Sequence, residues 1–425
     1  MQAPPLDPLP GAAPGFTELL DAFRGRLEGE IAAWLAAKRQ AAGPGALREL
    51  IDALEQLMAH GGKRLRPALV YHTYLACTGL GEPRAGGADG AVGAVGGNGA
   101  STGGDREVLP LALATEFLHS YLLIHDDIMD HAAVRRGQPS AHVRFRDAHL
   151  ARALAGDAED FGRSAAILLG DLAHGYAVEL YTSVGPAAAS RELAGCFSAM
   201  CEEVIGGQFL EMQLAHRGAG RSSSRTAGAD ASASHAPPGN GPGTAAAESA
   251  RAAALTAELT AVLRLKSGRY TAERPIQLGA LLAGAPPLVL ALLSAYGWAV
   301  GEAFQLQDDL LGMFGDAGAV GKPVGADLRE GKFTFLIHHA LATASPEERR
   351  TIEEALGRSD ATDAEVERVR ELLLTTGARA AVEAMVAERL ERARAALAGL
   401  AGFELRPDGR LFLAGLLDYL RERKQ

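Results

Sequence analysis

The chain has 425 residues, a formal net charge of −10 at pH 7, and a composition that is 48% hydrophobic and only 5% aromatic. The negative charge argues against a nucleic-acid-binding protein, because phosphate backbones favour a basic surface. Abundant alanine and leucine favour a large core of helices, so the expected fold class is all-α.

The cysteines and the N-terminal residues bear on location. Cys77, Cys196 and Cys201 are odd in number and lack the spacing of a metal or redox motif, so we expect no disulfide framework. Residues 1–16 contain no basic region followed by an apolar one, so no signal peptide is predicted. These features favour a cytoplasmic protein.

The first strong helical pattern covers Leu47–Met58. Its apolar residues recur at the i, i+3, i+4 spacing of one helix face, and Gly61 and Gly62 form a natural stop. A basic stretch, GGKRLRP, follows directly, so we expect a helix that ends in a basic loop.

Two segments differ in composition from the rest of the chain. Residues 81–104 and 218–248 are rich in Gly, Ser, Ala and Pro and show no periodicity. Such segments bury too little apolar surface to offset chain entropy, so both are predicted to be disordered insertions.

The second long helix is predicted over Val108–Asp130. It is apolar around most of its circumference, which indicates a buried helix, and its acids stand at the C-terminal end. Further helices are expected within 199–215, 259–284 and 296–316.

The uncharged stretch from Pro275 to Gly301 is long enough to cross a membrane. Pro286 and Pro287 interrupt it, however, so we interpret it as two buried helices with a break rather than a membrane span. The expected architecture is one domain over 1–425, a helical bundle around one core.

The acids at the end of the second helix indicate a metal site. Asp126 and Asp130 lie one turn apart on the same helix face, with Asp127 beside them. Such a cluster repels itself, and the helix dipole at a C-terminus adds to the cost. Carboxylates without nearby Cys or suitably spaced His favour Mg²⁺, which shares its coordination shell with substrate phosphates.

A second acidic pair and scattered basic residues complete this picture. Asp308 and Asp309 come late in another apolar helix, with Gln305 one turn earlier on the same face. Two acidic helix ends with magnesium between them would hold a diphosphate. Basic residues that stand at helix ends or in loops, from which phosphate contacts can be made, are Lys63, Arg64, Arg66, Arg135, Arg136, Lys266, Lys322 and Lys332.

The motifs GGKRLRP, HDDIMD with RRGQPS, GGQFLEM, KSGRY and FQLQDDLLGMFGD with GKPVGADLREGK occur in this order. Together they resemble the trans-isoprenyl diphosphate synthases of the polyprenyl synthetase family, from about Leu47 onward. The resemblance implies a prenyltransferase, commonly a homodimer, that joins isopentenyl diphosphate head-to-tail to an allylic diphosphate. It also implies Mg²⁺, three ions per active site, with Mn²⁺ as a possible substitute. For the fold, the resemblance implies that the helical bundle surrounds a central apolar tunnel.

The resemblance assigns roles to individual residues. Asp126, Asp127 and Asp130 match the first aspartate-rich motif, and Asp308 and Asp309 match the second, as metal ligands. The residues that match isopentenyl diphosphate contacts are Lys63, Arg66, His119 and Arg136. The residues that match allylic diphosphate contacts are Arg135, Lys266, Lys322 and Lys332. Ser267 stands where threonine is usual, and Gln305 matches the motif glutamine.

Two positions depart from the family pattern. Gly312 stands where many members have a third aspartate, and Glu211 stands where aspartate is common. Asp316 is further along and is not counted as a ligand. These departures concern the metal geometry rather than the reaction class.

Product length is predicted from the residues just before the first motif. In the family, bulky side chains there form a floor that stops the growing chain, and here Tyr121 and Leu122 occupy the fifth and fourth positions before Asp126. One aromatic before an uninterrupted motif resembles synthases that make geranylgeranyl diphosphate, and farnesyl diphosphate is the alternative.

Other interpretations stay open at this point. A class I terpene cyclase would share the first motif, although its second metal motif differs and it needs no second diphosphate site. A non-catalytic subunit of a heteromeric prenyl synthase is another alternative. His119 and Tyr121 are also compatible with core packing, and Glu211 with a surface position.

Overall fold

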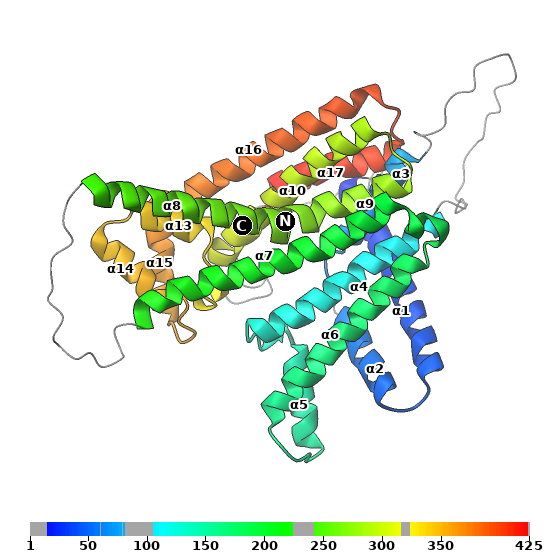
Figure 1. Ribbon diagram of the computed structural model, residues 1–425, viewed down its shortest axis with the longest axis horizontal. Coiled ribbons are helices and arrows are strands. Elements are labelled where there is room, and N and C mark those ends of the chain that lie inside the picture. The colour runs from blue at the N-terminus through cyan, green and yellow to red at the C-terminus, as the bar shows by residue number, and fades with distance from the viewer. Residues whose placement is uncertain are drawn as a thin grey trace, which may run out of the picture.

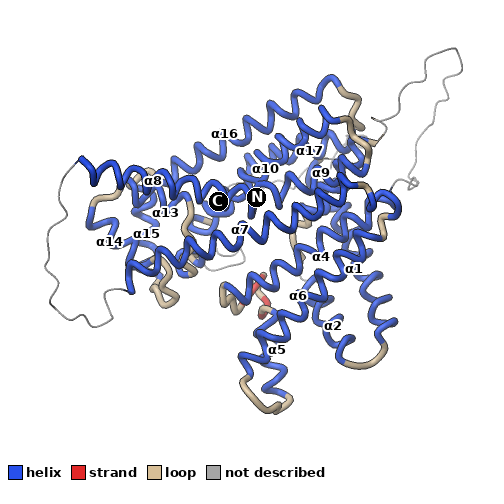
Figure 2. Tube along the Cα trace, in the orientation of Figure 1, coloured by secondary structure: helices blue, strands red, loops and turns tan. Residues whose placement is uncertain are grey.

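The computed structural model describes residues 15–59, 61–78, 80, 105–223, 242–315 and 324–423. Within these ranges the chain is helical around one hydrophobic core (Figure 1). One two-stranded hairpin is the sole β-structure of the described part (Figure 2). The predicted all-α fold class is confirmed.

The elements follow each other in a simple order. The first half contains α1 (Phe16–Ala42), α2 (Ala46–Ala59), α3 (Leu65–Cys77), α4 (Asp105–Met129), β1 (Val134–Arg135), β2 (Gln138–Pro139), α5 (Ala141–Ala151), α6 (Ala158–Thr182), η1 (Gly185–Ala189) and α7 (Arg191–Ser223). The second half contains α8 (Pro242–Val262), η2 (Leu263–Glu273), α9 (Arg274–Leu282), α10 (Pro287–Phe314), α12 (Ala326–Arg329), α13 (Phe335–Thr343), α14 (Pro346–Ala355), α15 (Asp363–Thr375), α16 (Ala378–Gly399), η3 (Leu400–Gly402) and α17 (Pro407–Glu422).

Two central helices, α4 and α10, carry the acidic motifs at their C-terminal ends. Helix α4 packs along α6, while α10 lies between η2 and α16. The break predicted in the uncharged stretch is confirmed, because α9 ends at Leu282 and α10 begins at Pro287. Proline suits the first position of a helix, since the backbone N–H that it lacks would have no hydrogen-bond partner within the helix there.

Two described helices, Glu107–Met129 and Pro287–Phe314, are long and apolar enough to cross a membrane by length and composition alone. In their most apolar windows, 67% and 50% of the residues are buried inside the protein. The structure therefore uses both as core helices that deliver acidic ends to a shared site.

The predicted insertions meet the structure only in part. Residues 81–104 lie outside the described residues. Helix α7 extends to Ser223 and helix α8 begins at Pro242, so both edges of the range 218–248 are helical, while residues 224–241 lie outside the described residues. The insertion stays a prediction. Ala245–Ala247 favour helix at the start of α8.

Candidate active site

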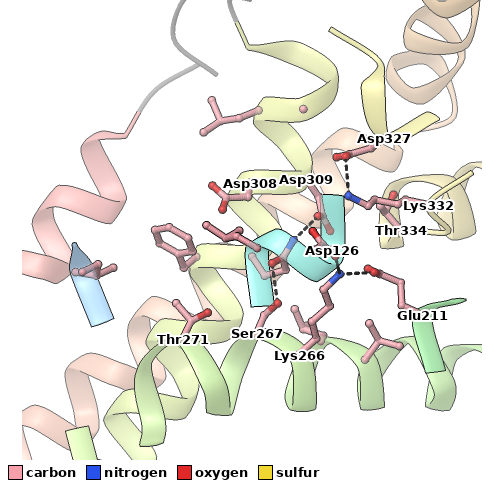
Figure 3. A pocket seen from close by; sticks show the side chains of 18 of the residues that line it. Asp126, Glu211, Lys266, Ser267, Thr271, Asp308, Asp309, Asp327, Lys332 and Thr334 are labelled. Carbon is pink, nitrogen blue, oxygen red and sulfur yellow. Dashed lines mark hydrogen bonds and ion pairs between the residues drawn. The ribbon is translucent and has the colours of Figure 1, made fainter. Parts of the chain in front are cut away.

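A cavity of about 680 Å³ opens where the ends of α4 and α10 meet η2 (Figure 3). Most of the residues predicted from the sequence line it together. They are Lys63, Arg66, His119, Asp126, Arg135, Arg136, Lys266, Ser267, Gln305, Asp308, Asp309 and Lys332. Glu211 and Gly312 also line it.

The acids of the first motif take different positions. Asp126 lines the cavity, whereas Asp127 is 1% exposed, lies outside the lining and accepts a hydrogen bond from Arg135 Nε at 2.6 Å. In the structure the Asp127 carboxylate holds an arginine, and its predicted role as a metal ligand stays a prediction. Asp130 lies beside the lining, 3.7 Å from Lys332 Nζ, and burial together with Asp126 raises its pKa to about 6.

The β1–β2 hairpin sends its two arginines in different directions. Arg136 and Gly137 both have positive φ, 53° and 73°, as a tight two-residue hairpin turn requires. Arg135 turns back to α4, whereas Arg136 donates to Gly61 O. A Cβ at Gly62 would lie 2.7 Å from Arg136 Nη2, so the glycine makes room for this guanidinium.

The basic loop before α3 is fixed by a buried ion pair. Arg64 has a positive φ of 49°, is 4% exposed, and pairs with Glu116 of α4, which is 3% exposed. This pair fixes Arg64, and its neighbours Lys63 and Arg66 line the cavity with it. Lys63 Nζ lies 5.6 Å from the centre of the Phe304 ring.

Arg66 and His119 form the centre of the basic side. Arg66 Nη2 donates to Thr271 Oγ1 at 2.9 Å, and its Nη1 is 3.2 Å from His119 Nε2. Burial and the neighbouring Arg66 hold the pKa of His119 well below its usual range. The ring is therefore neutral and can accept or donate one hydrogen bond at each nitrogen according to its tautomer.

At the end of α10 a chain of hydrogen bonds orients one carboxylate. Ser267 Oγ donates to Gln305 Oε1 at 2.7 Å, and Gln305 Nε2 donates to Asp309 Oδ1 at 2.8 Å. Burial, with Asp327 nearby, raises the pKa of Asp309 to about 8. Burial also raises the pKa of Asp308, although Arg423 Nη2 lies 2.6 Å from its Oδ1.

Two lysines bridge the acidic groups. Lys266 of η2 pairs with Glu211 and lies 3.7 Å from Asp126 Oδ1 (Figure 3). Lys332 lies 3.3 Å from Asp327 and 2.9 Å from Glu330. Burial alone would lower the pKa of each lysine, but the surrounding carboxylates raise it, so both stay charged.

Sequence reasoning missed several residues of this site, notably Thr271, Asp327 and Arg423. Asp327 is informative because its Oδ2 lies 2.7 Å from the point where a Cβ at Gly312 would stand. A carboxylate from α12 thus occupies the space beside the position where a third motif aspartate was expected. Asp327 is part of the sequence motif GADLREGK, but only the fold shows that its carboxylate lies beside α10.

Besides Asp127 and Asp130, three predicted residues do not reach the cavity lining or cannot be placed. Lys322 lies outside the described residues. Tyr121 packs against the rings of His125 and His174, with centroids 4.8 and 5.0 Å away, and Leu122 packs against the core. Their predicted part in setting product length stays a prediction.

The acidic residues face each other across the cavity rather than forming a closed cage. Among the described residues no three His, Cys, Asp or Glu side chains converge closely enough to hold a metal ion alone. The buried carboxylates with raised pKa values still favour a nearby cation, and Asp130 Oδ2 is buried without a hydrogen-bond partner. This donor set fits a hard ion that takes its remaining ligands from water and phosphate.

A family model described as polyprenyl synthetase matches residues 48–234 and 239–373 of the chain. The chain belongs to the polyprenyl synthetase family. It is a prenyltransferase.

Individual relatives agree with this family. A short chain isoprenyl diphosphate synthase of Methanocaldococcus jannaschii is 28% identical over 325 residues, covering 76% of each chain. A geranylfarnesyl diphosphate synthase of Aeropyrum pernix is 30% identical over 372 residues, covering 86% of this chain and 92% of that protein. The crystal structure of a geranylgeranyl pyrophosphate synthase from Corynebacterium glutamicum, complexed with isoprenyl diphosphate and magnesium, is similar with a TM-score of 0.75 at 30% identity. It covers 95% of this chain and 99% of that chain.

The buried Arg64–Glu116 pair generates a stability prediction for this prenyltransferase. Glu116→Ala removes the carboxylate that balances a buried guanidinium, so the free energy of unfolding should fall by about 3–5 kcal/mol in urea denaturation. Glu28→Ala is the matched control, because Glu28 lies 3.9 Å from the same arginine but is 44% exposed. Its loss should stay below about 1 kcal/mol. Equal losses in the two variants would show that the buried pair does not fix the loop.

Proposed function

We propose that the chain catalyses the Mg²⁺-dependent, head-to-tail condensation of isopentenyl diphosphate with an allylic diphosphate. The observation that carries the proposal is one cavity lined by two sets of residues that can bind diphosphates. Two acidic helix ends with lysines between them form one set, the acidic side, and Lys63, Arg66 and Arg136 form the other, the basic side. Two diphosphates can therefore bind together in different settings.

The acidic side suits the diphosphate that leaves. Metal ions bound at Asp126, Asp130, Asp308 and Asp309 would supply positive charge for the departing diphosphate oxygens. Lys266 and Lys332 are fixed by their carboxylate partners and add charge where the anion develops. Such preorganised charge is usually the largest electrostatic contribution to catalysis.

The basic side suits the diphosphate that stays. Lys63 comes from the loop before α3, Arg66 comes from the first turn of α3, and Arg136 comes from the hairpin. Arg66 is held in place by Thr271, so its guanidinium is ready to bind phosphate oxygens in a bidentate manner. Binding here would hold the homoallylic double bond close to the ionising carbon.

The cavity lining also includes apolar side chains. Leu123, Leu263 and Phe333 are among the side chains that can exclude water from an allylic cation. Strong side-chain bases are not required, because the departing diphosphate can take the final proton.

The metal requirement is proposed in more detail. We expect three Mg²⁺ ions per active site, with Mn²⁺ as a substitute. The described carboxylates of α4 and α10 do not enclose an ion by themselves, so each ion would take further ligands from the diphosphate and from water. Asp327 would support the ion at Asp309, which compensates for glycine at position 312.

We also propose a homodimer in the cytoplasm, with no membrane span and no nucleic acid as partner. Phe161, Leu168 and Val178 are large exposed apolar residues that share one broad face of α6. A second copy of this chain would cover this face.

The proposed main product is geranylgeranyl diphosphate, with farnesyl diphosphate as the alternative. The single aromatic Tyr121 before the first motif supports the longer of the two. The relatives are named for more than one product, so the length has to be measured on this chain.

The function is tested by incubating the purified protein with labelled isopentenyl diphosphate, Mg²⁺ and dimethylallyl, geranyl or farnesyl diphosphate. We expect chain elongation, mainly to twenty carbons, that EDTA abolishes. Asp309→Asn should lower kcat about 100-fold or more, while Asp418→Asn, at an exposed acid of α17, should not. Absence of an elongated product with every primer would refute the proposal, and a cyclised hydrocarbon would favour the terpene cyclase.

Tyr121→Ala tests the floor of the cavity. Removing the ring opens space between α4 and α6, so the product should lengthen by one or more five-carbon units in a chromatographic size analysis. Tyr121→Phe keeps the ring and should leave the distribution as in the wild type. An unchanged distribution in the alanine variant would assign Tyr121 to packing alone.

A further inference from the structure

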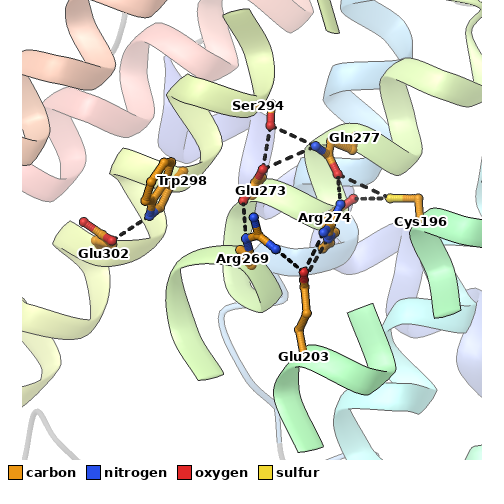
Figure 4. A network of polar contacts seen from close by, with 9 residues as sticks. All are labelled: Cys196, Glu203, Arg269, Glu273, Arg274, Gln277, Ser294, Trp298 and Glu302. Carbon is orange, nitrogen blue, oxygen red and sulfur yellow. Dashed lines mark hydrogen bonds and ion pairs between the residues drawn. The ribbon is translucent and has the colours of Figure 1, made fainter. Parts of the chain in front are cut away.

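The active-site lysine Lys266 lies on η2, a π-helix with charged residues on its other side. In a π-helix hydrogen bonds join residues five apart, so residues four or five apart share a face. Lys266, Ser267 and Thr271 line the cavity. Arg269 and Glu273 lie on the opposite face, and Arg274 continues it at the start of α9 (Figure 4).

Glycines on both neighbouring helices make room for this wide segment. A Cβ at Gly207 of α7 would stand 2.6 Å from the Lys266 backbone nitrogen. On α10, a Cβ at Gly301 would stand 2.3 Å from Gly268 O, and one at Gly297 would stand 2.8 Å from Glu273 Cα. Because backbone meets backbone here, packing fixes the distance of η2 from its neighbours.

One carboxylate binds both arginines on the far side. Glu203 of α7 accepts hydrogen bonds from Arg274 Nε at 2.8 Å and from Arg274 Nη2 at 2.6 Å, and it also accepts one from Arg269 (Figure 4). Burial would raise the pKa of Glu203, but the two arginines outweigh it and the pKa is lowered. Glu203 therefore stays ionised between them.

A second carboxylate secures the end of η2. Glu273 Oε1 accepts from Ser294 Oγ at 2.6 Å and from Gln277 Nε2 at 3.3 Å. Arg274 in turn donates to Gln277 Oε1 at 2.6 Å, so the network joins α7, η2, α9 and α10.

Helix α7 thus contacts η2 on both faces. Glu203 binds the far side, and Glu211, two helical turns further along α7, binds Lys266 on the cavity side. A rotation of η2 that moved Lys266 would have to break the pairs of Glu203 as well.

We propose that Glu203 is a positioning residue that sets the rotation of η2 through Arg269 and Arg274, and thereby the place of Lys266 at the leaving diphosphate. The inference rests on the proposed condensation. Glu203 does not line the cavity, so its effect on catalysis passes through the π-helix.

The test compares Glu203→Gln with Glu202→Gln, its exposed neighbour on α7, in the full-length protein. Glutamine keeps the size of the side chain but loses its charge, so kcat should fall about tenfold or more while KM for isopentenyl diphosphate changes less than about threefold. Glu202→Gln should match the wild type in both. Equal kinetics in the two variants would overturn the proposal.

A double-mutant cycle separates positioning from general destabilisation. In a Lys266→Ala background, Glu203→Gln should lower kcat less than twofold further, because its effect acts through the missing lysine. A full additional tenfold loss would overturn the proposal. If Glu203→Gln fails to fold, Arg269→Gln leaves the Arg274 pair intact and should give a smaller loss with the same dependence on Lys266. An inactive wild type would refute the proposed function instead, so the two failures are distinguishable.

Discussion

The fold is organised around buried carboxylates of like charge that face one cavity. Asp126 ends one long apolar helix and Asp309 lies near the end of another, and burial raises the pKa of Asp309 to about 8. When ionised, such carboxylates repel each other, and this repulsion together with burial is why their pKa values are raised. Cationic side chains from other elements balance them, with Lys266 from η2 and Lys332 from the loop after α12. Each of these elements is placed so that its end or its loop reaches the same cavity.

The sequence was most informative where local pattern and chemistry coincide. The helix ending in a basic loop, the acidic end of α4 and the break at Pro286 all follow from periodicity, capping and proline geometry. The cavity then brings Lys63, Asp126 and Asp309 together as their motifs predicted. A helix that is buried around its whole circumference needs apolar residues at nearly every position, so charged residues at its end are easy to recognise in the sequence.

The remaining features depend on distant contacts or on backbone geometry that no short pattern reveals. Asp127 belongs to the same motif as Asp126, yet Arg135 draws its carboxylate out of the cavity. Asp327 reaches α10 only because Gly312 leaves space beside it. The widened turn of η2 has the same apolar spacing as an α-helix over a short segment, so the sequence predicted helix there without its π character.

The most direct test of the facing acidic helix ends is a calorimetric titration with a non-reactive allylic thiolodiphosphate, in Mg²⁺ and in EDTA. If metal and diphosphate bind together between α4 and α10, the affinity should be at least about 100-fold higher with Mg²⁺, roughly 2.7 kcal/mol. Asp126→Asn should lose most of that gain. Equal affinity in Mg²⁺ and EDTA would contradict a metal-bridged diphosphate site at these helix ends.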